Sequence, residues 1–299
     1  MIDLPENFLK GSYPPIITPF KNDAVDFDTY SELVERLIKE GSHGILVNGT
    51  SAEPSTLTIE ERNQIVSIAV DTAAKRVPVV AATGSQSIQD TRELTDYAER
   101  SGADALLVVT PYYVRPPQRG IVKYYQDISE RTDLPLMIYH IPGRTAVSLT
   151  IDTLREISDT CENLVGMKHA VNDINFVTDA LLSVGNKFRI FVGLEDLSFP
   201  MLAVGACGMM NAVGNLSPKK VADLYDAVKK GNLTEARQLH FELWELNKAV
   251  FFDTNPISIK YMLRKLKVIP RNEHRLPMVA ATPDLEQRLD AVLKSSGLM

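Results

Sequence analysis

Residues 105–139 have the sequence ALLVVTPYYVRPPQRGIVKYYQDISERTDLPLMIY, and this stretch carries the clearest indication of the fold. Two apolar runs, Ala105–Thr110 and Leu134–Tyr139, flank a segment with helical spacing, Arg119–Arg131. The runs are nearly continuous in apolar residues rather than alternating, which is typical of parallel strands covered on both faces. The stretch therefore predicts a strand, a helix and a second strand.

The same alternation continues in both directions along the chain. The predicted strands are Pro15–Phe20, Gly44–Asn48, Val77–Ala82, Ala105–Thr110, Leu134–Tyr139, Leu164–Lys168, Phe188–Gly193 and Gly208–Val213. Eight strand–helix units in series are compatible with a closed barrel or with an open, doubly wound sheet. The number of repeats and the absence of a Gly-x-Gly-x-x-Gly motif after the first strand favour an α/β fold of the (β/α)8 TIM barrel type. A chain of 299 residues is long enough for such a barrel with an extension.

Helical periodicity fills the segments between these strands, and Thr58-Ile-Glu-Glu61 has the pattern of a capping box. The predicted helices are Asp28–Glu40, Thr58–Lys75, Ser87–Gly102, Arg119–Arg131, Thr150–Thr160, Asp173–Gly185 and Ser217–Gly231. After the eighth unit the pattern is purely helical, over Leu233–Phe252, Pro256–Lys267 and Pro283–Ser295. We therefore expect a catalytic barrel over residues 1–231 and a C-terminal helical appendage over residues 232–299.

Composition excludes several classes of partner. The formal net charge is −6 and there is no basic run, so nothing indicates nucleic acid or a membrane surface as a partner. Two cysteines, Cys161 and Cys207, are too few for a disulfide framework and have no ligand spacing for a metal. No apolar segment is typical of a signal peptide or a membrane span, and we expect a cytoplasmic protein.

In barrels of this class the active site lies at the carboxyl ends of the strands. Lys168 ends a predicted strand after Leu164-Val-Gly-Met, where a buried charge is unusual. Burial favours the neutral amine, which is the form that attacks a carbonyl group. Alternatively, the side chain of Lys168 extends from the end of the strand into solvent.

Other polar side chains are predicted at the same end of the barrel. Tyr139 ends the neighbouring strand, where its hydroxyl is placed to relay a proton or, alternatively, only to pack with a hydrogen-bonded hydroxyl. Thr50 and Ser51 follow Gly49 in a turn whose backbone N–H groups suit a carboxylate, although ordinary turns look the same. Together with Arg144, these residues form the set expected for amine catalysis on a 2-oxo acid.

At this level the chain resembles the dihydrodipicolinate synthase / N-acetylneuraminate lyase family of class I aldolase-like enzymes over nearly its whole length. The segments that carry the resemblance are Gly49-Thr50-Ser51-Ala52-Glu53, Val109-Thr110-Pro111-Tyr112-Tyr113, Tyr139-His140-Ile141-Pro142-Gly143-Arg144-Thr145, Gly166-Met167-Lys168 and Asn255-Pro256-Ile257. None of them is decisive alone, but their order and spacing around eight strand–helix units are specific to this family.

The resemblance implies a role for each of these residues. Lys168 would form an imine with pyruvate, with Tyr139 as the general acid and base beside it. Thr50 and Tyr113 would complete a proton relay, with Tyr113 reaching in from a neighbouring subunit of a homo-oligomer, a dimer of dimers. Thr50 and Ser51 would hold the carboxylate of pyruvate. We also expect Gly193 and Met210, in the seventh and eighth strands, to bind substrate. The resemblance implies no metal and no organic cofactor.

The second substrate is less well defined by the sequence. The resemblance implies that Arg144 grips the carboxylate of L-aspartate semialdehyde, so that the product is 4-hydroxy-tetrahydrodipicolinate. Ala52, Val114 and His169 stand where the synthase branch usually has Gly, Asn and Glu. These departures favour a second hypothesis, an aldolase or dehydratase acting on a 2-keto-3-deoxy acid or a related 2-oxo acid. A third hypothesis is a barrel that only binds a small acid.

Several remaining residues permit two interpretations. His169 either contacts a non-standard substrate or, because adjacent strand residues alternate sides, points outward. His140 is a candidate for the border of the pocket. Trp244 and the pair Phe251-Phe252 lie on a helical stripe and are expected in the core or in an interface. Residues 54–62 lack the polar and histidine residues of the lysine feedback site of some synthases, so we expect little inhibition by lysine.

Overall fold

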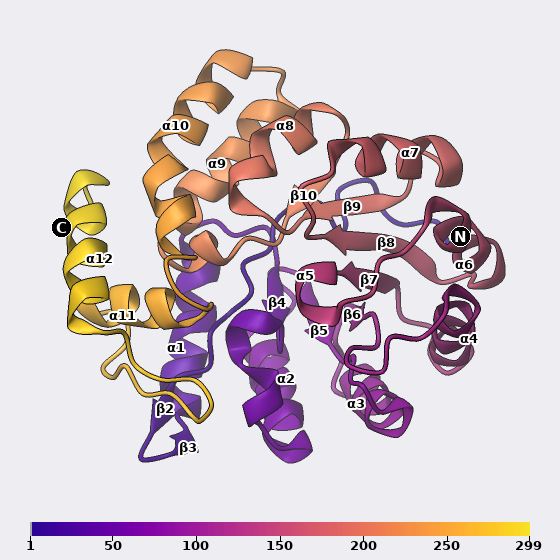
Figure 1. Cartoon of the computed structure of the whole chain (residues 1–299), viewed down its shortest axis with the longest axis horizontal. Helices are drawn as coiled ribbons and strands as arrows, with labels where there is room; N and C mark the ends of the chain where they lie inside the picture. Colours follow the sequence, from indigo (N-terminus) through magenta and orange to yellow (C-terminus); the bar gives the residue numbers. More distant parts are fainter. Residues whose placement is uncertain (1) are drawn as a thin grey trace.

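The computed structural model describes residues 2–299, and at its centre eight parallel strands curl into a barrel (Figure 1). The strands are β1 (Gly11–Ser12), β4 (Ile45–Val47), β5 (Val79–Ala82), β6 (Ala105–Val109), β7 (Leu136–His140), β8 (Leu164–His169), β9 (Arg189–Val192) and β10 (Gly208–Met209). Their order in the sheet is β1-β10-β9-β8-β7-β6-β5-β4, so neighbours in sequence are neighbours in space. The predicted (β/α)8 barrel is confirmed.

The barrel closes through the segment that follows β1. Gly11 pairs with Gly208 of β10 on one side, and Pro15 forms a parallel bridge with Leu46 of β4 on the other. Two backbone hydrogen bonds support this bridge, from the N–H of Ile16 to Leu46 O at 3.0 Å and from the N–H of Leu46 to Pro14 O at 3.1 Å. One short segment therefore joins the two ends of the sheet.

The first predicted strand, Pro15–Phe20, is wrong in its placement, because the ladder strand is β1, several residues earlier. Prolines have no N–H to donate to a ladder, and Pro14, Pro15 and Pro19 interrupt this stretch. The end of the predicted strand belongs to a separate antiparallel hairpin, formed by β2 (Phe20–Lys21) and β3 (Ala24–Val25). The last predicted strand also ends earlier, because residues 212–215 form the 3-10 turn η4 (Ala212–Asn215).

Helices surround the barrel between successive strands. They are α1 (Phe27–Lys39), α2 (Ile59–Ala73), α3 (Ile88–Arg100), α4 (Gln118–Ser129), α6 (Ile151–Thr160), α7 (Ile174–Val184) and α9 (Pro218–Lys229). All seven were predicted, and the capping box of Thr58 and Glu61 is present in full at the start of α2. Two short helices, α5 (Pro142–Thr145) and α8 (Ser198–Ala203), were not predicted, because so few residues show no periodicity.

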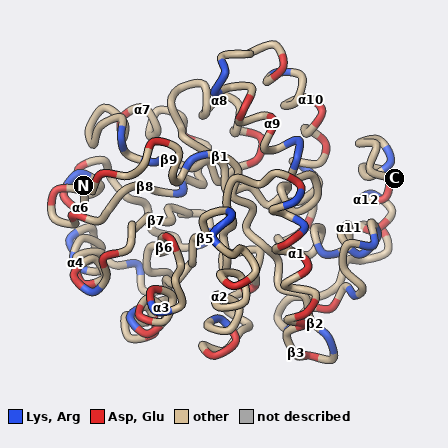
Figure 2. Tube along the Cα trace, turned by 180° about the vertical axis from the view of Figure 1, so that it is seen from behind, with Lys and Arg blue, Asp and Glu red and all other residues tan. Residues whose placement is uncertain are grey.

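Apolar side chains form two cores. Inward-facing strand residues such as Leu107, Met137, Val165 and Phe191 fill the barrel, and a larger cluster lies between strands and helices. Charged residues lie mostly on the surrounding helices and loops (Figure 2). No helix in residues 2–299 is long and apolar enough to cross a lipid bilayer.

Three further helices follow the barrel, as predicted: α10 (Leu233–Ala249), α11 (Ile257–Lys265) and α12 (Pro283–Ser295). Helix α10 packs along α9, and α11 packs against α12 (Figure 1). Of the residues expected in the core or in an interface, Phe252 packs against the core, whereas Trp244 and Phe251 are 39% and 47% exposed and lie outside it. For these two residues the interface alternative stays a prediction. The division into a barrel of residues 1–231 and a helical appendage of residues 232–299 remains a proposal. Helix α11 of the proposed appendage is bound to the barrel through buried polar contacts, such as that of Lys260 with Glu53.

Candidate active site

The pairing of β7 with β8 brings together the two residues on which the predicted chemistry rests. Tyr139 is the register partner of Lys168, and His140 is the partner of His169. Because side chains alternate along a strand, the two pairs face opposite sides of the sheet. Tyr139 and Lys168 point into the barrel, where Lys168 is only 4% exposed and its Nζ lies 4.6 Å from the centroid of the Tyr139 ring. The predicted extension of Lys168 into solvent is therefore wrong.

His140 and His169 lie on the outer side of the sheet, buried under α7. The ring of His169 is stacked on Phe176 at 4.8 Å, and the Nδ1 atoms of the two histidines are 3.2 Å apart. Burial lowers the pKa of His169 to about 4, and burial together with His169 lowers the pKa of His140 to about 3. The outward orientation of His169 is confirmed, and His140 does not border the pocket.

Thr50 and Ser51 lie in a 3-10 turn, η1 (Thr50–Ala52), that directly follows β4. The Thr50 hydroxyl oxygen is 3.1 Å from the Tyr139 hydroxyl oxygen, so a proton can be exchanged between the two groups. Ser51 is buried, and its Oγ accepts a hydrogen bond of 3.0 Å from Nδ2 of Asn255. The first N–H groups of such a turn have no partner within it, which leaves them free to bind an anion.

Lys168 lines a small cavity of about 60 Å³. Its wall contains the predicted residues Thr50, Ser51, Tyr139, Arg144, Lys168, Gly193 and Met210. One bound water needs roughly 10–15 Å³ of such space, so the cavity has room for about four to six water-sized groups. That is the size of a three-carbon oxo acid. A Cβ atom on Gly193 would lie 3.0 Å from Cε of Lys168, so a side chain at this position would press on the lysine.

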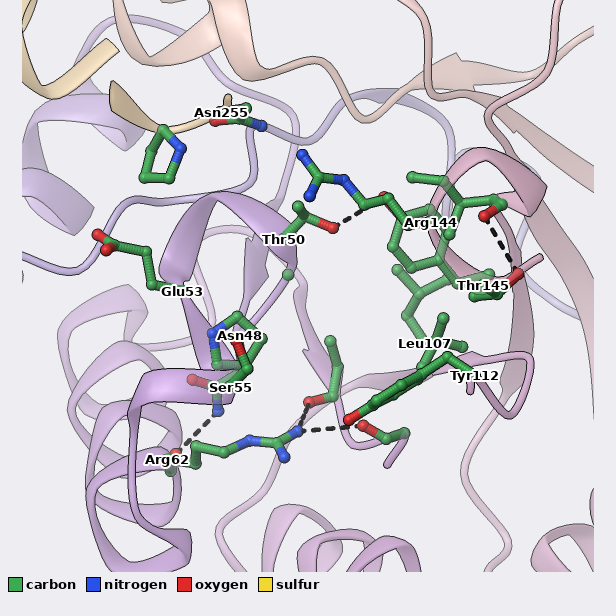
Figure 3. A pocket seen from close by; sticks show the side chains of 18 of the residues that line it. Asn48, Thr50, Glu53, Ser55, Arg62, Leu107, Tyr112, Arg144, Thr145 and Asn255 are labelled. Atoms are coloured by element: carbon green, nitrogen blue, oxygen red, sulfur yellow. Dashed lines mark hydrogen bonds between the residues drawn. The ribbon is translucent and has the colours of Figure 1, made fainter. Parts of the chain in front are cut away.

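A larger cavity of about 260 Å³ adjoins the first, and Thr50, Tyr139, Arg144 and Asn255 line both (Figure 3). It extends to Arg62 and Tyr112, and Arg62 is 8% exposed. One amino group of Arg62 donates to Ala82 O at 3.1 Å, and burial lowers the pKa of the guanidinium to about 10. No carboxylate of the described chain lies within ion-pairing distance of it. The wall of the second cavity therefore contains the unpaired guanidinium of Arg62, together with Arg144 and with Glu53, whose carboxylate is paired with Lys260.

Arg144 and Tyr113 differ in their relation to this site. Arg144 is exposed on the short helix α5 and lines both cavities, so it stands at their common mouth. Tyr113 is 88% exposed, has a positive φ of 72°, and lines neither cavity within this chain. The structure thus gathers every predicted site residue except Tyr113.

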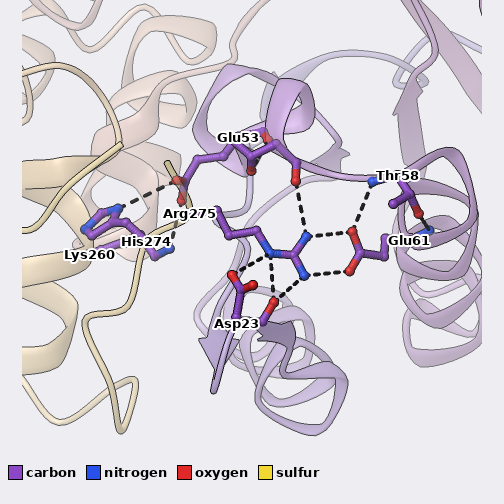
Figure 4. A network of polar contacts seen from close by, with 8 residues as sticks. Asp23, Glu53, Thr58, Glu61, Lys260, His274 and Arg275 are labelled. Carbon is purple, nitrogen blue, oxygen red and sulfur yellow. Dashed lines mark hydrogen bonds and ion pairs between the residues drawn. The ribbon is translucent and has the colours of Figure 1, made fainter. Parts of the chain in front are cut away.

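Sequence patterns missed several residues of the site. Arg62, Glu195 and Asn255 line the cavities, and Lys260 of α11 forms an ion pair with Glu53 that is part of the network in Figure 4. Glu53 and Asn255 lie in segments that carry the family resemblance, which was the available signal. Lys260 ends the stretch Asn255–Lys260, which also resembles the synthases and was expected to have a structural role between barrel and appendage. Arg62 and Glu195 showed no such signal, because their importance arises from burial beside distant segments.

Comparisons with known proteins agree with this geometry. A model of the Dihydrodipicolinate synthetase family matches residues 8–296. A curated 4-hydroxy-tetrahydrodipicolinate synthase from Thermus thermophilus is 40% identical over 291 residues, which cover 97% of each chain. The crystal structure of dihydrodipicolinate synthase from Aquifex aeolicus superimposes with a TM-score of 0.95 at 36% identity, covering 97% of this chain and 98% of that one. The Acinetobacter baumannii synthase, solved in complex with pyruvate, has a TM-score of 0.94 at 32% identity, with 97% and 100% coverage.

Proposed function

Because the chain belongs to the dihydrodipicolinate synthetase family, we propose that it condenses pyruvate with L-aspartate semialdehyde through an imine on Lys168, as a 4-hydroxy-tetrahydrodipicolinate synthase. The observation that carries this proposal is the 3.1 Å contact between Thr50 and Tyr139 in the wall of the cavity that contains Lys168. The buried amine of Lys168 and the hydroxyls of Thr50 and Tyr139 can then act on the same small substrate.

In the first half of the reaction the small cavity takes up pyruvate. The backbone N–H groups and hydroxyls of Thr50 and Ser51 bind its carboxylate, and the neutral amine of Lys168 attacks its keto carbon. Tyr139, hydrogen-bonded to Thr50, moves the proton that accompanies loss of the carbinolamine hydroxyl. The resulting iminium withdraws electrons from the methyl group, so this chemistry requires neither a metal nor an organic cofactor.

In the second half the larger cavity admits the aldehyde. Loss of a methyl proton converts the iminium to an enamine, and the enamine carbon attacks the aldehyde carbon of the semialdehyde. Arg144, at the common mouth of the two cavities, binds the carboxylate of this substrate through a planar pair of N–H donors. The guanidinium thereby holds the aldehyde end toward Lys168.

A second candidate retains the imine and changes the partner of pyruvate. The cavity of about 260 Å³ extends beyond Arg144 to Arg62, which is more space than a four-carbon semialdehyde occupies. This observation favours a longer acidic substrate such as a 2-keto-3-deoxy acid. Ala52 and Val114 remain the departures from the synthase pattern that agree with it, whereas His169 points away from the cavities.

The assembly is also part of the proposal. Tyr113 is exposed and lies outside both cavities of its own chain, on the loop between β6 and α4. A role in the proton relay therefore requires that Tyr113 enters the site of a second subunit. We accordingly expect at least a homodimer for full activity.

Borohydride trapping tests the imine. Incubation with pyruvate and sodium borohydride is expected to add the mass of a reduced pyruvate adduct to Lys168, as located by peptide mass spectrometry. An unmodified Lys168 would contradict the proposal and leave the hypothesis of a barrel that only binds a small acid. A steady-state screen of pyruvate with aspartate semialdehyde, against a panel of 2-keto-3-deoxy acids, then separates the two candidate substrates.

A further inference from the structure

Glu195 is a buried carboxyl group in the wall of the small cavity, and no step described so far uses it. It begins the 3-10 turn η3 (Glu195–Leu197), two residues after Gly193, and its side chain is shielded from solvent. Because Gly193 has no Cβ, the turn after β9 can approach Lys168 closely. Glu195 and Lys168 therefore line the same cavity of about 60 Å³.

Only one of the two carboxyl oxygens of Glu195 is used by the fold. Oε1 accepts hydrogen bonds from the N–H groups of Ala212 at 2.6 Å and Val213 at 3.4 Å, which anchors the turn η4. Oε2 is buried and has no hydrogen-bond partner in the part of the chain that the structure describes. A purely structural anchor for η4 needs only Oε1, and leaving Oε2 buried and unpaired costs free energy.

The surroundings of Glu195 keep its two charge states close in free energy. Burial raises the pKa of Glu195 to about 7, against the opposing effects of the Ala212 N–H and the positive charge of Lys168. The other titratable groups that the described residues contribute to this cavity wall are Tyr139 and Arg144. The neighbouring elements η4 and α10 contribute the backbone N–H groups named above and the amide of Asn247, which donates to Glu195 O at 3.3 Å.

We propose that Glu195 is the source of the proton that Tyr139 delivers when the iminium forms on Lys168, and that Glu195 then remains as the carboxylate that balances its charge. This inference rests on the imine chemistry proposed above. A neutral amine, the keto group of pyruvate and a carboxylic acid give a protonated imine, water and a carboxylate. The C=N bond forms and the C–O bond of the carbinolamine breaks. Tyr139 gives its proton to the leaving oxygen, which departs as water, and then takes up the proton of Glu195, which lines the same cavity.

In the next step Glu195 acts in the opposite direction and takes up a proton. When the methyl carbon of the iminium loses a proton, the positive charge on nitrogen disappears, and the carboxylate of Glu195 no longer faces a cation. Taking up a proton again returns Glu195 to its neutral form beside the neutral enamine. The summed charge of Lys168 and Glu195 thus stays the same through both steps, which avoids creating an unbalanced charge in a buried site.

The test compares Glu195→Gln with Asp196→Asn, which removes the same charge from the exposed neighbour. The rate of pyruvate-dependent borohydride trapping on Lys168 is measured in single turnovers between pH 5 and 9. We expect the ratio of the wild-type rate to the Glu195→Gln rate to fall as the pH rises through about 7, because both proteins share Lys168 but only the wild type has the acid. Glu195→Gln is expected to be about 100-fold slower than the wild type near pH 6 and less so above pH 7, whereas Asp196→Asn is expected to resemble the wild type at every pH.

The outcomes separate this proposal from the one on which it rests. Trapping in Glu195→Gln at the wild-type rate, with the same pH dependence, would overturn the role of Glu195 while leaving the imine established. Absence of trapping in the wild type would instead overturn the imine. A thermal melt at pH 5 shows whether Glu195→Gln is folded. If it is not folded, Glu195→Asp replaces it, and a ratio of wild-type to variant rates that stays constant between pH 5 and 9 overturns the proposal.

Discussion

Nζ of Lys260 lies 2.7 Å from Oε1 of Glu53, and the side chains of both residues are completely buried. Glu53 follows the turn that carries Thr50 and Ser51, whereas Lys260 belongs to α11, 207 positions later in the chain. His274 lies beside the same carboxylate, with Nδ1 3.6 Å from Oε2 (Figure 4). The C-terminal helices therefore hold the loop that forms the substrate cavity.

Breaking this pair is expected to destabilise the protein strongly. Lys260→Met leaves the Glu53 carboxylate buried without its main partner, and the expected loss is about 3–5 kcal/mol in the free energy of unfolding. Urea denaturation followed by circular dichroism measures it. The control is Lys265→Met, which removes the half-exposed pair with Asp290 and is expected to cost less than about 1 kcal/mol. Equal losses in both variants would contradict the prediction.

Tyr139→Phe is expected to lower kcat by about 100- to 1,000-fold with little effect on folding. The substitution removes the hydroxyl that faces Thr50 at 3.1 Å, and with it the proposed proton transfer, while the ring beside Lys168 remains. Steady-state kinetics and a thermal melt are the measurements. Tyr125→Phe is the matched control, because its hydroxyl donates to Val108 O at 2.9 Å in the core, away from both cavities. Loss of activity in the control alone would argue against the assignment.

Arg144→Ala distinguishes the two candidate substrates. If the guanidinium binds the carboxylate of aspartate semialdehyde, the KM for this substrate is expected to rise by about 10- to 100-fold, as loss of a charged hydrogen bond predicts. The KM for pyruvate should change far less, because Thr50 and Ser51 bind its carboxylate. Arg119→Ala, at an exposed position on α4, is the control. An unchanged KM for the semialdehyde would favour the 2-keto-3-deoxy acid hypothesis.

The buried pair of His140 and His169 is expected to make the protein sensitive to acid. Their pKa values of about 3 and 4 lie below the ordinary 6.5, so between about pH 6.5 and pH 4 the unfolded chain binds more protons than the folded one. Stability from this source is complete above pH 6.5 and is lost as the pH falls, by up to about 1.4 kcal/mol per pH unit for each histidine.

Urea denaturation at pH 7 and pH 5 measures this loss in the wild type and in His169→Gln. The variant is expected to lose about 2 kcal/mol less over this interval, because glutamine does not titrate and one depressed group has been removed. The same decrease in both proteins would mean that other groups cause the acid sensitivity.

Much of the fold and half of the site followed from local patterns. Apolar runs and helical periodicity predicted seven of the eight strands in place and all seven long helices of the barrel, since each element needs one face or both buried. Strand ends then identified Lys168 and Tyr139, because the rule for barrel enzymes depends only on where a strand stops. The sequence left Trp244 and Phe251 between core and interface, because periodicity shows which residues share a face but not what covers it.

Local patterns therefore determined the architecture, the caps and the strand-end positions of the two residues of the proposed chemistry, since these depend on neighbours within a few positions. Tertiary structure alone decided the rest. The barrel closes at Pro15 rather than along a full first strand, and Lys260 reaches Glu53 across most of the chain. Glu195 became a buried acid beside Lys168 only because β8 and β9 lie side by side in the barrel. Burial and electrostatic coupling depend on distances in space, which no local spacing in a sequence contains.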